Sequence, residues 1–167
     1  MSSPQSIKKA KLIIAIIYPE NNKPTELMIE LKGLYGEFTP SKVIDFNYTK
    51  FYEKEFGKNL KKIYLAFEKE FDIEKLPKIK LQCYDFEKRY LKNDKRFYNI
   101  DPGYITKNSF VLASFKERAH RIYLKDNVYA DLQLVYENKH WKSFNWTFPD
   151  VKEKIIQEFL KQIRKSL

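Results

Sequence analysis

The sequence predicts an α+β fold in a single domain, and three observations lead to that prediction. Helix-like and strand-like apolar periods alternate over the first hundred residues, and short runs of period two dominate the later ones. No repeat, composition break or Gly/Ser linker divides the 167 residues. A chain of this length buries roughly 70% of its unfolded surface, which is enough for one core. We therefore expect a single α+β domain over residues 8–167, preceded by a disordered tail over residues 1–7.

The order of the first elements is typical of a ferredoxin-like βαββαβ core. A buried strand is expected over residues 11–18. A helix then starts at Pro24, which suits a first turn because no amide hydrogen is needed there. Gly33 and Gly36 offer the positive φ that ends a helix. A second strand is expected over residues 42–47.

The rest of this core follows up to residue 100. Thr49 can cap a short helix that stops at Gly57. A third strand is expected over residues 62–68. An aspartate then caps a long helix over residues 72–91, and a strand over residues 97–100 completes the core.

An antiparallel β-meander and a C-terminal helix are expected to extend the core. Asp126-Asn127 tolerates positive φ and suits a tight hairpin turn. Asp150 and Glu153 are spaced as a capping box for the last helix. Asp101-Pro102-Gly103-Tyr104 is predicted to be a turn, because Pro presets φ and Gly accepts positive φ. The strands of the meander are expected over residues 110–115, 120–125, 128–137 and 140–144.

Composition excludes several classes of protein. The single cysteine, Cys83, excludes an intramolecular disulfide and a multi-cysteine metal site, which fits a reducing, cytoplasmic location. The apolar run over residues 12–18 is far shorter than the ~20 residues of a membrane span, so no membrane partner is expected. Four glycines, at positions 33, 36, 57 and 103, cannot form a Walker A loop. We expect no cofactor and no metal.

The net charge of +10 invites a nucleic-acid interpretation, because basic surfaces release phosphate counterions. Only five of the 32 basic residues are arginine, and the lysines are scattered among acids along the chain. We therefore favour a compositional bias over a nucleic-acid ligand as the explanation of the charge. The best nucleic-acid candidate is a stretch in which basic residues alternate with aromatic ones: Lys88, Arg89, Lys92, Lys95 and Arg96.

Hairpin geometry gives the sharpest prediction of a site. With Asp126-Asn127 as the turn, Ile122 faces Asp131 and His120 faces Gln133. Side chains alternate along strands, so His120, Tyr129 and Asp131 should share one face and Arg121 should lie on the other. An imidazole beside a carboxylate can serve as a general acid or base. The alternative is that His120 is a half-buried structural residue.

The leading functional hypothesis is a protein that binds, or acts on, a small anionic metabolite or nucleotide. His120, Asp131 and Asp101 are the candidate catalytic residues. The candidate ligand-binding residues are Arg121, Lys116, Arg118, Tyr104, Tyr129 and Trp146. A nucleic-acid- or ribosome-associated binding module and a protein-interaction domain without a ligand remain the alternatives, and the oligomeric state stays open.

Five motifs stand out along the chain: Asp45 to Gly57, Asp101-Pro102-Gly103-Tyr104, His120-Arg121-Ile122-Tyr123-Leu124, Tyr129-Ala130-Asp131 and Trp146-Thr147-Phe148-Pro149-Asp150. Together they resemble a prokaryotic family catalogued as a domain of unknown function. The resemblance covers nearly the whole chain, and it implies a shared site without naming a reaction. Asp131 stands where that family more usually has glutamate, and Phe148 where it more usually has tyrosine.

Overall fold

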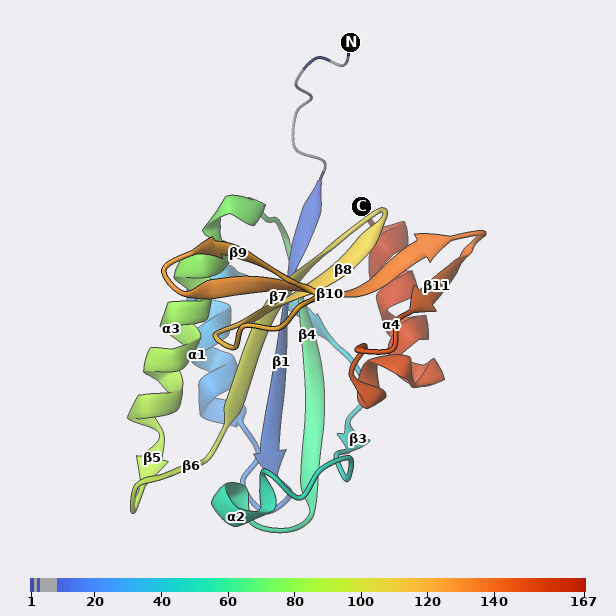
Figure 1. Cartoon of the computed structure of the whole chain (residues 1–167). Helices are drawn as coiled ribbons and strands as arrows, with labels where there is room; N and C mark the ends of the chain where they lie inside the picture. The colour runs from blue at the N-terminus through green and yellow to red at the C-terminus, as the bar shows by residue number, and fades with distance from the viewer. Residues whose placement is uncertain (2, 4–8) are drawn as a thin grey trace.

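A large antiparallel sheet with helices on both faces organises the chain (Figure 1). The computed structural model describes residues 1, 3 and 9–167, so the tail expected over residues 1–7 lies almost entirely outside the described residues. The elements are β1 (Ala10–Pro19), α1 (Thr25–Tyr35), β2 (Phe38–Pro40), β3 (Ile44–Asp45), α2 (Glu53–Phe56), β4 (Leu60–Glu70), α3 (Leu76–Arg89), β5 (Leu91–Lys92), β6 (Lys95–Arg96), β7 (Asn99–Thr106), β8 (Ser109–Ser114), β9 (Arg121–Lys125), β10 (Val128–Glu137), β11 (His140–Ser143) and α4 (Lys154–Lys165).

The sheet follows the order β11-β10-β8-β7-β1-β4-β2, with β3 paired to β4 and β9 paired to β10. Every pairing in it is antiparallel. The predicted α+β class is confirmed, and the sheet, which has nine strands in the part of the chain that the structure describes, is larger than predicted. Among the described residues, no helix is long and apolar enough to cross a bilayer.

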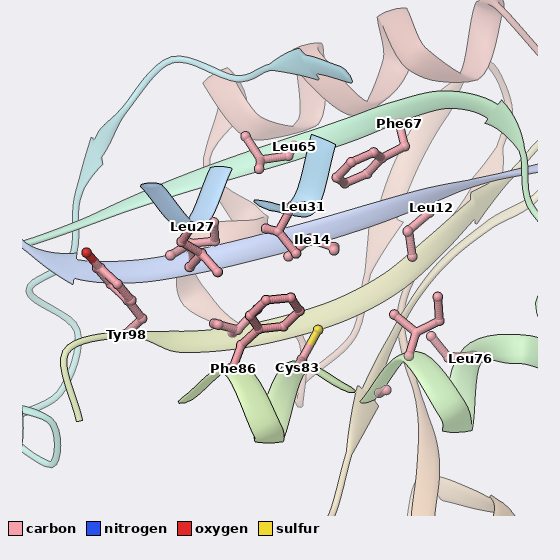
Figure 2. Packing of buried hydrophobic residues seen from close by; sticks show 14 of the residues in the cluster. Leu12, Ile14, Leu27, Leu31, Leu65, Phe67, Leu76, Cys83, Phe86 and Tyr98 are labelled. Carbon is pink, nitrogen blue, oxygen red and sulfur yellow. The ribbon is translucent and has the colours of Figure 1, made fainter. Parts of the chain in front are cut away.

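The two faces of β1 bury two different cores, because successive side chains of a strand point to opposite faces. Leu12 and Ile14 face α1 and α3, whereas Ile13 and Ala15 face α4. Figure 2 shows the first core, where Leu27 and Leu31 of α1 pack with Leu76, Cys83 and Phe86 of α3. Full burial of such an aliphatic or aromatic side chain is worth about 1.5–3 kcal/mol.

Several predicted boundaries agree with the structure. Gly36 and Gly57 end α1 and α2 with φ values of 94° and 86°. Asp126 and Asn127 both have positive φ, at 53° and 58°, which is the geometry of a tight hairpin turn. The strand expected over residues 42–47 is shorter, however. Within it only β3, Ile44–Asp45, forms a strand. A separate short strand, β2, precedes it at Phe38–Pro40, and between the two the Ser41 Oγ accepts the Tyr64 N–H.

The predicted turn at residues 101–104 is wrong, because this segment lies inside β7. Asp101 pairs with Ala15 of β1, and Gly103 pairs with both β1 and β8. A Cβ on Gly103 would lie 2.1 Å from the Val111 carbonyl oxygen. The glycine therefore permits a close approach of two strands, and it does not form a turn.

The pairing of β7 with β8 begins at Gly103, and the two strands are not paired on the N-terminal side of that residue. We call this unpaired stretch the β7–β8 seam. At the seam, the Ile100 N–H is donated to the Glu87 Oε1 at 2.6 Å, and the Lys80 Nζ lies 3.4 Å from the Ile100 oxygen. These two α3 side chains take the place of a partner strand. Since alternate residues of an antiparallel strand direct their amides to the same side, Pro102 lies at the next position on this edge, where no N–H has to be paired.

The predicted capping box at the start of α4 is also wrong. Residues Pro149–Lys152 form a short 3-10 helix, and Glu153 precedes α4 without a side-chain cap. Asp150 is 1% exposed and points into the protein. Its carboxylate has a buried ammonium as partner, which competes successfully with the weaker helix cap.

The predicted register of the β9–β10 hairpin is off by one residue. The pairs are Tyr123 with Tyr129 and Arg121 with Asp131, because an irregularity follows the Val128–Lys125 pair. A β-bulge of this kind moves all later side chains to the other face. Arg121 and Asp131 therefore share a face, contrary to the prediction.

Candidate functional site

A cavity of about 570 Å³ lies at the seam between β7 and β8. Such a volume lies within the range of ligand pockets. The loop Phe46–Tyr52, the ends of β8 and β10 and the Pro149-Asp150 turn complete its walls. Basic, acidic and aromatic side chains all line it. The basic ones are Lys62, Lys80, Arg96, Lys116, Arg118 and Arg121, and the acidic ones are Glu87, Asp101, Asp131 and Asp150.

One buried ion pair joins β4 to the turn before α4. The Lys62 Nζ lies 2.6 Å from the Asp150 Oδ2, and both side chains are at most 4% exposed. The Tyr64 hydroxyl also donates to this carboxylate. Burial, and then the charge of Asp150, raises the pKa of Tyr64 well above its ordinary value, so the phenol stays a donor. The pair fixes the Pro149-Asp150 turn against the sheet.

A second ion pair lies at the seam. The Lys80 Nζ donates to the Asp101 Oδ1 at 2.8 Å, and the Asn99 Nδ2 donates to its Oδ2 at 2.6 Å. Burial, the largest single effect, raises the pKa of Asp101, but the charges of Lys80 and Lys62 and the hydrogen bonds from Lys80 and Asn99 together outweigh it, and the pKa lies below its ordinary value. Asp101 is therefore an ionised acceptor in the cavity at neutral pH.

Arg96 fastens the loop that forms one wall of the cavity. Its guanidinium makes two hydrogen bonds to Glu55 of α2, at 2.6 and 2.9 Å, and one to Glu87 of α3 at 3.0 Å. The forked contact fixes both position and orientation. Burial, opposed by the Ile100 N–H, raises the pKa of Glu87.

Asp131 is the centre of a third polar cluster. The Arg121 Nε donates to its Oδ2 and the Gln133 Nε2 donates to its Oδ1, both at 2.8 Å. A second irregularity, at Gln133 in β10, brings Gln133 beside Asp131. The Arg121 Nη1 also donates to the Ser114 Oγ at 2.9 Å and to the Lys116 carbonyl at 2.7 Å. Arg121 therefore positions the segment that carries Lys116.

His120 lies behind this cluster. Its Nε2 is 3.3 Å from the Asp131 Oδ1, but the ring N–H is not aligned for a hydrogen bond. The imidazole stacks on the Trp146 ring at 4.8 Å, and Trp146 stacks in turn on Phe144 at 4.7 Å. The predicted proximity of His120 and Asp131 is present, while Asp131 alone of the two faces the cavity.

Two basic side chains at the rim differ from those inside. Lys116 and Arg118 have no carboxylate within 4.0 Å in the part of the chain that the structure describes. The Lys116 Nζ lies 5.1 Å from the centre of the Phe51 ring. These two cations give the rim of the cavity a positive charge that no carboxylate of the described residues pairs with directly.

The structure thus brings together part of the predicted site. Asp101, Asp131, Lys116, Arg118 and Arg121 line the cavity. Within the described residues, its lining does not include the other predicted members. Tyr104 packs toward the core under α1 and α3, Tyr129 packs on Tyr123, and the Trp146 Nε1 donates to the Leu132 carbonyl at 2.8 Å.

The alternative basic surface is largely compensated. Lys88 pairs with Asp85 at 2.8 Å and Arg89 with Glu30 at 2.7 Å. Arg96 belongs to the Glu55–Glu87 contact inside the cavity wall. Lys92 and Lys95 remain on the short β5–β6 hairpin.

Sequence reasoning missed Lys62, Lys80 and Asp150. A signal for the first two was present. Lys62 shares a face of a buried strand with Tyr64, and Lys80 shares a helical stripe with Leu76 and Cys83. A lysine at such a position needs a buried partner. The partner of each lies far away in sequence, so spacing alone does not identify it.

These features define an α+β protein built around a charged, aromatic-walled cavity. Among the described residues, no group of three or more His, Cys, Asp or Glu side chains is placed to hold a metal ion. The family described as Domain of unknown function (DUF4416) matches residues 8–167, and the chain belongs to this family. The chain has no significant match among curated proteins or among solved structures.

Proposed function

We propose that the protein binds a small anionic metabolite or nucleotide in the cavity at the β7–β8 seam. One observation carries the proposal: within the described residues, Lys116 and Arg118 stand at the rim without a carboxylate partner, although the basic groups deeper inside are paired. An anionic ligand would supply the missing charge. Arg118 offers forked geometry to a phosphate or a carboxylate.

The cavity walls support a ligand with a flat or apolar part. Phe46, Tyr52 and Phe148 lie along them. Ligand pockets commonly combine such apolar walls with a few placed polar groups. The paired floor supplies both donors, from Lys80, and acceptors, from Asp101.

Acid–base chemistry is the catalytic form of the proposal. Asp101 and Asp131 line the cavity and are the candidate acid–base groups. His120 is a positioning residue that acts through Asp131, since its imidazole lies 3.3 Å from that carboxylate and behind it. The loss of His120 should then move the pH profile of a reaction more than the affinity for its substrate.

The proposal includes a ferredoxin-like core and a cytoplasmic location. The order β7-β1-β4-β2, with α1 and α3 packed on one face of β1, supports the first. A single cysteine, buried in the core, supports the second.

The test is a thermal-shift screen followed by calorimetry. The panel contains nucleotides, sugar phosphates and carboxylates, and the variants are Arg118→Ala and Lys116→Ala. Glu117→Gln, between the two cations, is the matched control. A ligand at a hundred times its Kd adds roughly 2.7 kcal/mol of stability. Loss of the shift in Arg118→Ala, with Glu117→Gln binding at least as tightly as the parent, supports the proposal. A panel without any shift counts against it.

A further inference from the structure

Exposed aromatic side chains gather at the mouth of the cavity. Phe51 is 63% exposed, Tyr84 46%, and Tyr48 and Phe115 38% each, and all four line the same opening. They come from the loop before α2, from α3 and from the end of β8. Exposed apolar groups that are gathered in this way mark a place where a partner binds.

Cations lie between these rings. The ammonium of Lys116 is 5.1 Å from the Phe51 ring centre. Those of Lys80, 5.2 Å from Phe115, and Lys88, 4.6 Å from Tyr84, are already paired with Asp101 and Asp85. Tyr84 and Phe115 also meet edge to face at 5.7 Å. The mouth therefore combines exposed π faces with two cations, Lys116 and Arg118, that have no carboxylate partner among the described residues.

This combination of exposed rings and cations indicates what kind of partner can bind. An apolar protein surface would have to bury the cations of Lys116 and Arg118 without pairing them, which is costly. A chain of flat rings joined by phosphates meets both requirements, because bases stack on aromatic side chains and phosphates pair with cations. A duplex does not, since its bases already stack on one another. The net charge of +10 favours the same polyanion.

We propose that the mouth of the cavity binds single-stranded nucleic acid, with one nucleotide inside the cavity and its neighbours stacked on Phe51, Tyr84 and Phe115. The inference rests on the proposed anion-binding function and extends it from a single small ligand to a strand. It is centred on Phe51, Lys116 and Arg118 and not on the Lys88–Arg96 stretch, where three of the five cations are paired with carboxylates.

The test is fluorescence anisotropy with labelled six-nucleotide RNA and DNA strands, the corresponding duplexes and free mononucleotides. Phe51→Ala and Tyr84→Ala each remove one stacking face. Tyr123→Ala, 57% exposed on β9 and outside the cavity lining, is the matched control. We expect each cavity-mouth variant to weaken strand binding by about 5- to 150-fold and the control to leave it unchanged. Arg118→Ala should reduce the slope of log affinity against log salt by about 0.7, the value for one phosphate on a single strand.

The outcomes separate the two proposals. Binding of mononucleotides or sugar phosphates without any gain for the strands overturns this inference and leaves the anion-binding function standing. Duplex binding as tight as single-strand binding, or equal losses in Tyr123→Ala and Phe51→Ala, also overturns it. If neither strands nor small anions bind, both proposals fall. The ratio of RNA to DNA affinity identifies which strand the mouth prefers.

Discussion

The floor and the rim of the cavity carry similar charged groups in opposite states. At the floor, Lys62 and Lys80 are buried and each touches one carboxylate. At the rim, Lys116 and Arg118 are exposed and, within the described residues, have no such partner. We therefore expect the floor charges to stabilise the fold, whereas the proposed function assigns the rim charges to a ligand. Substitutions should therefore separate stability from binding.

The largest loss of stability is expected at Lys62–Asp150. Asp150→Ala leaves an ammonium that is 4% exposed without its partner, and such a change costs about 3–5 kcal/mol. The double variant Lys62→Met/Asp150→Leu should recover most of that loss, because no buried charge remains. Urea unfolding measures both. A single-variant loss below about 1 kcal/mol would mean that water reaches the Lys62 ammonium.

The Lys80–Asp101 pair, also at the floor of the cavity, should make the stability of the protein depend on pH. Because the pKa of Asp101 is lowered in the folded protein, its contribution to stability is fully present above the unfolded pKa of about 3.9 and is lost as the pH falls through the folded pKa. Asp101→Asn should be less stable than the parent at pH 7, and the gap should close below about pH 4. Asp85→Asn, at an exposed pair, is the control, and its gap should be smaller at every pH.

An intermediate loss of stability is expected at His120, which lies neither at the floor nor at the rim of the cavity. His120→Ala removes a stacked ring from Trp146 and should lower the stability by about 1 kcal/mol. Its affinity for the anion should fall far less than that of Arg118→Ala, because the imidazole lies behind Asp131. Calorimetry on both variants measures this. An equal loss of anion affinity in His120→Ala and Arg118→Ala would indicate that His120 contacts the ligand directly.

The smallest change in stability is expected at the rim. Lys116→Ala and Arg118→Ala remove exposed side chains and should stay within about 0.5 kcal/mol of the parent in urea. The same proteins are expected to lose the anion-binding signal. A destabilisation comparable to that of Asp150→Ala would show that the rim, too, is structural.

Local sequence patterns predicted much of the fold. The glycines that end α1 and α2, the Asp126-Asn127 turn and most of the strands follow from periodicity and turn chemistry. The family resemblance and the α+β class were also predictable. The register of the β9–β10 hairpin was not, because a bulge is set by contacts on both sides of β10 and leaves no local signature.

The site was predictable only in part, for a related reason. Asp101, Asp131, Lys116 and Arg118 were found because they cluster in sequence with unusual residues. Asp150 has a partner 88 residues earlier, and its local pattern resembles a helix cap. An aspartate spaced like a helix cap can equally be one partner of a long-range ion pair, and the local sequence does not distinguish these two roles.

The Lys62–Asp150 pair also bears on synthesis. Lys62 lies on a face of β4 that it shares with Tyr64 and Ala66, and α4 later covers this face. On the ribosome, the strand is complete long before residue 150 is made. During that interval we expect the solvated ammonium to oppose pairing with other chains, since a charge on an uncovered strand discourages such pairing. Once Asp150 has been synthesised, the same ammonium forms the buried ion pair. We therefore expect one lysine to protect the nascent sheet and later to hold the turn before α4 against it.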